Sequence, residues 1–332
     1  MRIVALEEHF VTPEVQAAWG ALPPDLQDVS DRQIEGSLRA KLLDLSGERV
    51  RQMDESGIDV QVLSLTTPAT QNLEADEAVR LARASNDLVA EAVRGRPDRF
   101  QGFAALPTPD PASAARELER AVVELGLNGA MLCGRTRERN LDHPDFLPVF
   151  EAASALRAPL YLHPQSPRPA VRDAYYGGFG GKLDTMYATS GIGWHYETGM
   201  QALRLILSGL FDRFPDLQVI LGHWGEVVLF YLDRVDTLTG AAREATALQR
   251  PVSEYFRSNV LVTPSGVFSH RYLRWSHEVL GIERILFSTD YPYLFAPEGG
   301  ARRFLEEAEL SGDERSLVAH GNWDRLCEGI RR

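Results

Sequence analysis

Cysteine is scarce in this sequence, which has two among its 332 residues. Cys133 and Cys327 stand alone, and no Cys-x-x-Cys pair occurs. A disulfide framework and a thiolate metal clip are therefore excluded. A metal site in this chain would have to be built mainly from histidine and carboxylate side chains.

Positive charge and long hydrophobic runs are also lacking. Lys and Arg number 35 against 47 Asp and Glu, which gives a formal net charge of −12. Proteins that hold nucleic acid or anionic membranes need a basic face, so both partners are excluded. Apolar stretches such as 227–232 fall far short of the roughly 20 residues that span a bilayer, and the run before Glu7 is too short for a secretory signal. We expect a cytoplasmic protein.

Short apolar, β-branched runs alternate with longer segments of helical period. No Gly/Ser/Pro-rich linker divides the chain, so we expect one folding unit over residues 1–332. Near-continuous apolar runs are typical of parallel strands buried on both faces. Helices are predicted at 46–56, 76–94 and 111–125, with glycine at or near their ends. Eight strands are predicted, at 3–6, 60–65, 100–105, 129–132, 159–162, 219–221, 260–262 and 285–288.

Eight strand-and-helix units in a chain somewhat above ~250 residues favour a (β/α)8 TIM barrel. A doubly wound open sheet is the alternative, but no Gly-x-Gly-x-x-Gly follows the first predicted strand. Long insertions follow the first and fifth strands, at 12–41 and 164–196. The second combines aromatic residues with many glycines, a composition typical of a pocket wall for a flat, apolar substrate or of a subunit contact.

Histidines and carboxylates gather where the predicted strands end. Glu7 and His9 lie two residues apart, so strand alternation points both to one side. His163, His223 and Asp290 end the fifth, sixth and eighth strands. In a barrel these ends meet at one mouth. Three imidazoles and two carboxylates suit Zn²⁺, with Mn²⁺ or Fe²⁺ as competitors, so their common placement favours a metal site over separate structural roles.

Other polar residues are expected to have structural roles. Glu8 should point away from the barrel mouth and pair with an Arg or Lys of the outer helices. Four histidines fall in predicted helices or loops and are treated as background: His143, His270, His277 and His320.

These strand-end residues resemble the amidohydrolase superfamily. Within it, the chain is similar to the metal-dependent, non-oxidative aromatic acid decarboxylases, among them the γ-resorcylate, 2,3-dihydroxybenzoate and 5-carboxyvanillate decarboxylases. Aminocarboxymuconate semialdehyde decarboxylase is more distant. The resemblance runs from residue 1 to about residue 328. It is carried by Glu7-x-His9 in the opening motif 5–10, by His163, by Ser-Gly-Leu-Phe-Asp at 208–212, by Leu-Gly-His-x-Gly-Glu at 221–226, and by Ile-Leu-Phe-Ser-Thr-Asp at 285–290.

The resemblance implies a role for each site residue. One divalent metal ion, Zn²⁺ or else Mn²⁺, would be bound by Glu7, His9, His163 and Asp290. His223 and Glu226 would form a hydrogen-bonded pair beside the metal. Asp290 would protonate the carbon that carries the carboxylate of a 2-hydroxybenzoate-like substrate, after which carbon dioxide leaves and a phenol remains.

Two other functions stay open from the sequence. A hydrolase of the same superfamily would use the same ligands, with Asp290 as the base for attack by water on a lactone, amide or ester. A barrel that keeps its metal for stability alone would turn over neither kind of substrate. The product distinguishes the two enzymes: carbon dioxide with a phenol, or a product that carries oxygen from water.

Departures from the family pattern fall where a substrate would lie. Cys133-Gly134 replaces the usual Asn-Gly after the fourth strand, Tyr291 stands where Trp is frequent, and His195 replaces a small residue. Arg234 matches a family position near the substrate, with a subunit salt bridge as the alternative. The expected substrate-binding residues are Trp194, His195, Arg234, Tyr291 and Tyr293. The resemblance also implies a homodimer or homotetramer.

Overall fold

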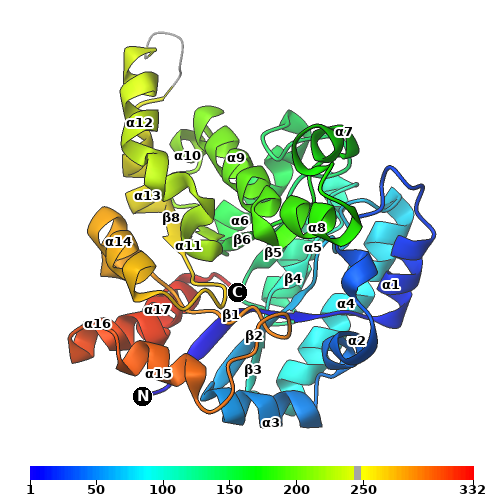
Figure 1. Cartoon of the computed structure of the whole chain (residues 1–332), viewed down its shortest axis with the longest axis horizontal. Coiled ribbons are helices and arrows are strands. Elements are labelled where there is room, and N and C mark those ends of the chain that lie inside the picture. The colour runs from blue at the N-terminus through cyan, green and yellow to red at the C-terminus, as the bar shows by residue number, and fades with distance from the viewer. Residues whose placement is uncertain (243–247) are drawn as a thin grey trace.

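Buried parallel strands form the centre of the molecule in a computed structural model that describes residues 1–242 and 248–332 (Figure 1). Every named strand pair is parallel, in the orders β1-β2-β3 and β4-β5-β6-β7-β8. The bounds are β1 (Val4–Phe10), β2 (Val60–Leu65), β3 (Phe100–Gly102), β4 (Ala104–Ala105), β5 (Ala130–Cys133), β6 (Leu160–His163), β7 (Val219–Leu221) and β8 (Val260–Val262).

Two irregular segments complete the ring. The predicted strand 100–105 is divided at Phe103, and its halves pair with β2 on one side and β5 on the other. The predicted strand 285–288 forms isolated bridges to its two neighbours instead of a continuous strand. The Leu286 amide donates to the Val262 carbonyl (2.9 Å), and the Leu6 amide donates to the Phe287 carbonyl (2.9 Å). The segment thus joins β8 to β1 and completes the predicted (β/α)8 barrel.

Helices surround this barrel and bury one face each. The long α4 helix (Ala75–Gly95), for example, buries Ala78, Leu81, Ala82 and Val89 at the spacing of one helical face. The three predicted helices are confirmed as α3 (Gly47–Ser56), α4 and α5 (Pro111–Val123). Further helices are α6 (Leu147–Leu156), α9 (Gly193–Leu207), α10 (Leu210–Arg213), α11 (His223–Glu226), α12 (Val228–Ala241), α13 (Val252–Asn259), α14 (His270–Leu280), α15 (Gly300–Glu306), α16 (Gly312–Ser316) and α17 (Asn322–Gly329).

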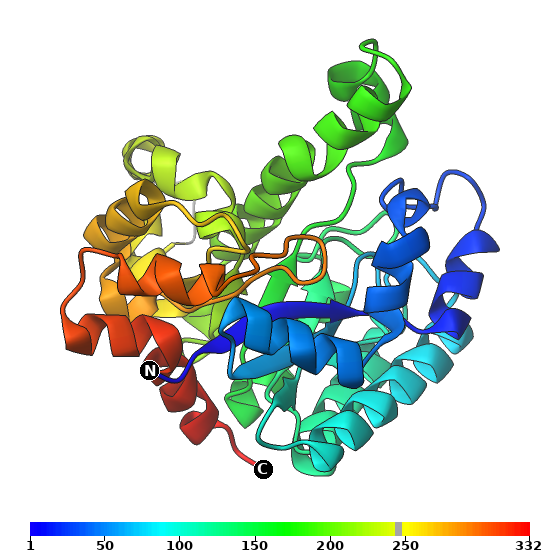
Figure 2. The same ribbon diagram turned by 60° about the horizontal axis from the view of Figure 1, so that its bottom comes forward.

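The two predicted insertions lie at the carboxyl ends of the strands. The first contains α1 (Pro13–Gly20) and α2 (Gly36–Leu43), and the second contains α7 (Pro169–Val171) and α8 (Gly181–Met186) before α9 begins. In Figure 2 the green part of the second insertion rises away from the barrel. Asp28 joins the two insertions, because its carboxylate accepts hydrogen bonds from the Ser166 amide (2.9 Å) and hydroxyl (2.5 Å).

None of the helices in the described ranges is both long enough and apolar enough to cross a bilayer.

Candidate metal centre

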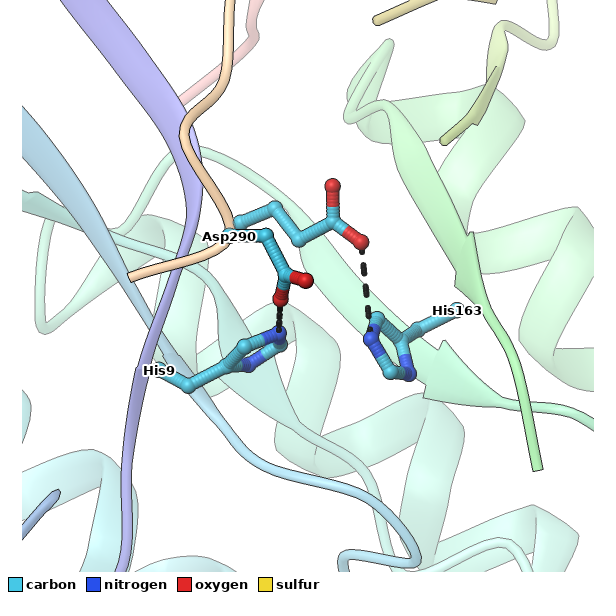
Figure 3. Close-up of side chains that lie close together, drawn as sticks. His9, His163 and Asp290 are labelled. Atoms are coloured by element: carbon cyan, nitrogen blue, oxygen red, sulfur yellow. Dashed lines mark ion pairs between the residues drawn. The ribbon is translucent and has the colours of Figure 1, made fainter. Parts of the chain in front are cut away.

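Four of the predicted residues come together at the carboxyl ends of the strands. Glu7, His9, His163 and Asp290 each offer a ligand atom, and these atoms all lie within 4.8 Å of one another. The His9 Nε2 atom is 3.4 Å from Asp290 Oδ1, and the His163 Nε2 atom is 3.4 Å from Glu7 Oε1. Figure 3 shows the rings of His9 and His163 turned toward the same space as the Asp290 carboxylate. The predicted ligand set is therefore one cluster.

These spacings fit ligands of one ion better than hydrogen bonds. An N–H···O bond is typically 2.7–3.2 Å long, shorter than either contact. Two ligands about 2.1 Å from a tetrahedral metal lie about 3.4 Å apart. Moreover, Glu7 Oε1 and His9 Nε2 are buried and have no hydrogen-bond partner in the described chain. Buried polar atoms are normally satisfied, so both observations support a divalent cation held between these side chains.

Neighbouring groups fix which atom of each ligand faces the centre. The hydroxyls of Tyr161 (2.5 Å), Ser265 and Ser288 (3.3 Å) all donate to Glu7 Oε2, which leaves Oε1 for the cluster. Burial raises the pKa of Tyr161, so its phenol keeps the proton that it donates. Such outer hydrogen bonds orient metal ligands and tune their affinity. Sequence reasoning missed these three hydroxyls because a lone Ser or Tyr carries no metal-site signal.

The two imidazoles are oriented in the same way. His163 Nδ1 lies 2.8 Å from the carbonyl of Pro164, an acceptor only, so the proton is on Nδ1 and Nε2 is free to bind a metal. His9 Nδ1 lies 3.2 Å from the Ser64 hydroxyl. Burial lowers the pKa of His9 to about 4 and holds the pKa of His163 well below its usual value. Both rings are therefore neutral at pH 7, as ligands must be.

The two carboxylates are strongly desolvated. Burial raises the pKa of Glu7, and nearby Asp290 raises it further. Burial also raises the pKa of Asp290 to about 7, although His223 and His195 oppose this shift. Asp290 Oδ1 faces His9, and at neutral pH the carboxyl group can both hold and release a proton. This position within the cluster suits a proton donor.

Strained backbone places several of these groups. Glu7 has a φ of +64° at a β-bulge, where the register between β1 and β2 shifts. Glu7 and His9 thus reach the same cluster, but through a bulge and not through the regular alternation expected from the sequence. Asp290 also has a positive φ, +59°. Non-glycine residues in this region cost free energy and cluster at functional sites.

His223 and Glu226 form the predicted pair beside the cluster. The His223 Nδ1 atom lies 2.8 Å from Glu226 Oε1, and Glu226 is completely buried. Burial opposes a charge on His223, but the Glu226 carboxylate outweighs it and raises the pKa of His223 to about 10. For Glu226, burial is likewise outweighed by His223 and His195, so its pKa is lowered. The pair therefore carries opposite charges at neutral pH.

Glu8 points away from the centre, as predicted, but its partners differ from the prediction. Its carboxylate accepts hydrogen bonds from the Thr289 amide (2.8 Å) and hydroxyl (2.6 Å) and from Gln61 Nε2 (2.9 Å). The basic residue nearby is Arg49, which is itself fully buried and donates to the side-chain oxygen Oε1 of Gln61 (3.1 Å). The Gln61 side chain thus lies between Glu8 and Arg49, so the expected direct ion pair was wrong.

The predicted substrate-binding residues separate into two groups. Tyr293 packs edge-on against His9 at 5.6 Å between ring centroids, and Trp194 packs against His163 at 6.2 Å. His195 lies 4.5 Å from the His223 ring. Tyr293 and Trp194 thus border the cluster, and His195 borders the neighbouring His223–Glu226 pair.

The other two do not join it. The Tyr291 ring lies over the Arg49 guanidinium at 4.7 Å and borders a cavity of about 160 Å³, with Met53 and Phe268, on the Glu8 side of β1. Arg234 is exposed on α12. Tyr291 was expected at the site because it follows Asp290 in the sequence, but its side chain turns away from the cluster toward Arg49.

The fold and the four-residue cluster together define a class of enzymes. These are barrels in which two carboxylates and two imidazoles at the carboxyl ends of the strands suit one divalent cation. The chain belongs to the amidohydrolase family, whose pattern, described as "Amidohydrolase", matches residues 39–326.

Several decarboxylases are similar along their full length. The γ-resorcylate decarboxylase of Polaromonas sp. JS666 is 38% identical over an alignment of 333 positions that covers 97% of each chain. The crystal structure of 5-carboxyvanillate decarboxylase from Sphingomonas paucimobilis has a TM-score of 0.91 at 38% identity and covers 99% of each chain. A dihydroxybenzoic acid decarboxylase from Polaromonas sp. JS666, with bound manganese and the inhibitor 2-nitroresorcinol, has a TM-score of 0.86 at 37% identity, covering 100% of this chain and 98% of that one.

Proposed function

We propose that the protein is a metal-dependent carboxy-lyase that converts a hydroxylated benzoate into a phenol and carbon dioxide without redox chemistry. The observation that carries the proposal is the position of Asp290. Its carboxyl group lies in the four-residue cluster with Oδ1 turned toward His9, which leaves Oδ2 to transfer a proton to a substrate held at the same centre. The decarboxylases named above, which are similar over nearly the whole chain, support the same reaction.

In this proposal Glu7, His9, His163 and Asp290 hold one divalent ion. When bound, that ion would orient and polarise a substrate that chelates through its carboxylate and adjacent hydroxyl. The buried, hydroxyl-braced Glu7 and the neutral rings of His9 and His163 fix the shape of this pocket. Trp194 and Tyr293 border the same pocket and present flat surfaces to an aromatic ring.

In the proposed reaction Asp290 gives one proton to the substrate, and His223 then restores the proton on Asp290. Asp290 Oδ1 faces His9, so the second oxygen, Oδ2, is the one proposed to transfer a proton to the ring carbon that bears the carboxylate. The bond between that carbon and the carboxylate then breaks, its electron pair restores the aromatic ring, and carbon dioxide leaves. His223, held by Glu226, stabilises the substrate's negative charge and returns a proton to Asp290 from solvent.

The metal and the assembly belong to the same proposal. A structure similar to this chain contains manganese, which makes Mn²⁺ a candidate beside the Zn²⁺ favoured by the ligand types. On the family resemblance we also propose a cytoplasmic homodimer or homotetramer. Elemental analysis of purified protein and light scattering after gel filtration test these two points.

The reaction is tested by its product. Protein loaded with Mn²⁺ or Zn²⁺ is incubated with 2,6-dihydroxybenzoate, 2,3-dihydroxybenzoate and 5-carboxyvanillate, and separately with simple lactones, in water enriched in ¹⁸O. We expect carbon dioxide and the matching phenol, with no ¹⁸O in the phenol. Turnover of lactones with incorporation of ¹⁸O, and none of the acids, would instead identify a hydrolase.

A further inference from the structure

Glu226 has a second imidazole partner that the reaction above does not use. The His195 Nδ1 atom lies 2.8 Å from Glu226 Oε2, while His223 Nδ1 lies 2.8 Å from Oε1. The two rings are 4.5 Å apart between centroids. One buried carboxylate is thus held from both sides, by His223 on its own turn and by His195 from the first turn of α9.

Glycine at position 199 makes this contact feasible. Gly199 lies one helical turn after His195, on the same face of α9. A Cβ at Gly199 would be 2.5 Å from the Glu226 carbonyl oxygen and 2.9 Å from Val228 Cγ2. The α9 helix therefore approaches the backbone of α11 as closely as a glycine permits, and this approach brings the short His195 side chain within reach of the Glu226 carboxylate.

The beginning of α9 is fixed just as tightly. A Cβ at Gly193 would be 2.2 Å from the Ala188 carbonyl oxygen, so only glycine fits where the insertion turns into the helix. Trp194 and His195 then diverge. Trp194 packs toward the metal ligand His163, and His195 packs toward Glu226. The second insertion thus touches both the metal cluster and the His223–Glu226 pair through adjacent residues.

The contacts of both ring nitrogens also fix the orientation of His195. Glu226 is an ionised acceptor, so the facing Nδ1 atom of His195 must donate. Its Nε2 atom lies 3.2 Å from the Ser190 carbonyl, which can only accept. Both nitrogens of His195 thus face oxygen atoms, which fixes the orientation of the ring between α9 and Glu226.

We propose that His195 is a positioning residue, which acts through Glu226 to hold His223 in its reactive orientation. The inference rests on the proposed function for the reaction that His223 assists. Two other roles fit the location less well. A direct substrate contact would leave the ring without its two partners, and a second metal bound by His195, His223 and Glu226 would replace bonds whose 2.8 Å lengths are those of hydrogen bonds. Unlike Glu7 Oε1 and His9 Nε2, the facing atoms of this trio are all satisfied.

Kinetics of Mn²⁺-loaded variants with 2,6-dihydroxybenzoate test the role. We expect His195→Ala to lower kcat about tenfold to a hundredfold, the range seen when outer hydrogen-bond partners are lost, with KM changed less than twofold. His195→Gln should recover part of the rate, because its amide N–H can donate to Glu226. Tyr196→Ala, at the exposed neighbouring position, is the matched control and should behave as wild type.

A double-mutant cycle with Glu226→Gln isolates the route of action. If His195 acts through Glu226, His195→Ala adds less than a twofold loss to Glu226→Gln. Full additivity would overturn the proposal. An increase in KM at unchanged kcat would also overturn it, because that result indicates a direct substrate contact. A second equivalent of bound metal that is lost in His195→Ala would overturn it as well, because that result indicates a metal ligand.

A spectroscopic measurement keeps this inference separate from the reaction. In protein labelled with ¹⁵N-histidine, the Nδ1–H protons of His195 and His223 should both resonate downfield, and Glu226→Gln should shift both. Unchanged signals in Glu226→Gln would contradict the shared carboxylate whatever the protein catalyses. Absence of carbon dioxide release by wild type, with both signals shifted, would reject the proposed function alone.

Discussion

The molecule contains two histidine–carboxylate groups side by side, and burial acts on them in opposite ways. In the metal cluster, burial lowers the pKa of His9 to about 4, and two ligand atoms have no hydrogen-bond partner in the described chain. In the second group, the Glu226 carboxylate raises the pKa of His223 to about 10, and the facing atoms are paired. The same side chain is thus prepared as a neutral ligand in one place and as a charged partner in the other.

The difference lies in how each carboxylate is held. Glu7 is braced by hydroxyls on one oxygen only, which leaves the other oxygen available to a cation. Glu226 is engaged by imidazoles on both oxygens. A carboxylate with a free oxygen favours metal binding, whereas one that is saturated by N–H donors serves to orient those donors.

The largest expected effect comes from changing the cluster itself. Asp290→Asn removes a ligand and the proposed proton donor together, so we expect a loss of kcat of at least about 10⁴-fold, the upper end of general acid catalysis. Exhaustive chelation of wild type should have the same effect and be reversed by Mn²⁺ or Zn²⁺. Circular dichroism should show an intact fold. Turnover of the variant near the wild-type rate would reject the role of Asp290.

A change in the second group should reduce the rate and spare the metal. His223→Asn is expected to lower kcat about 10²- to 10³-fold, while metal content measured by elemental analysis stays at the wild-type level. His270→Asn is the control, because His270 contacts the Phe304 carbonyl on the outer helices. Loss of most of the metal from His223→Asn would place His223 among the ligands and end the distinction between the two groups.

Two buried tyrosine hydroxyls can be removed for comparison, one that donates a hydrogen bond to Glu7 and one that has no partner in the described chain. Tyr161→Phe removes a 2.5 Å hydrogen bond to Glu7, so metal affinity should fall about tenfold to a hundredfold. In Tyr291 the hydroxyl is buried and has no partner within the described ranges. Tyr291→Phe should therefore leave metal affinity unchanged and raise the free energy of unfolding by up to about 1 kcal/mol. Competition with a fluorescent chelator measures the metal affinity, and urea unfolding measures the free energy of unfolding. Equal effects of both substitutions on metal affinity would contradict the proposal that the Tyr161 hydroxyl orients Glu7.

The pH dependence of metal binding should show the smallest effect. The raised pKa of Asp290, about 7, means that its carboxyl group is protonated below that pH in the metal-free protein. A metal must displace this proton, so its affinity should fall about tenfold per pH unit below pH 7 and level off above it. Chelator competition at pH 6, 7 and 8 gives the slope. An affinity independent of pH between 6 and 7 would mean that Asp290 binds the metal without losing a proton.

Much of this arrangement could be predicted from local sequence. The strands at 60–65, 219–221 and 260–262 have their predicted bounds, because continuous apolar, β-branched runs form buried parallel strands. Residues placed directly after such strands share one end of a barrel, which is why the separate positions of Glu7, His163 and Asp290 could be combined in advance. The segment 285–288 was predicted as a strand and forms bridges only, since hydrophobicity does not encode regular pairing.

The sequence by itself determined the barrel and the four residues that meet at its strand ends, because burial patterns and strand ends are local properties. Only the tertiary structure decided which way the side chains turn: the bulge at Glu7, Tyr291 directed to Arg49, and His195 brought to Glu226 by the close approach at Gly199. These contacts join segments distant in the chain, and their geometry depends on how closely backbones pack. No residue pattern within one segment contains that information.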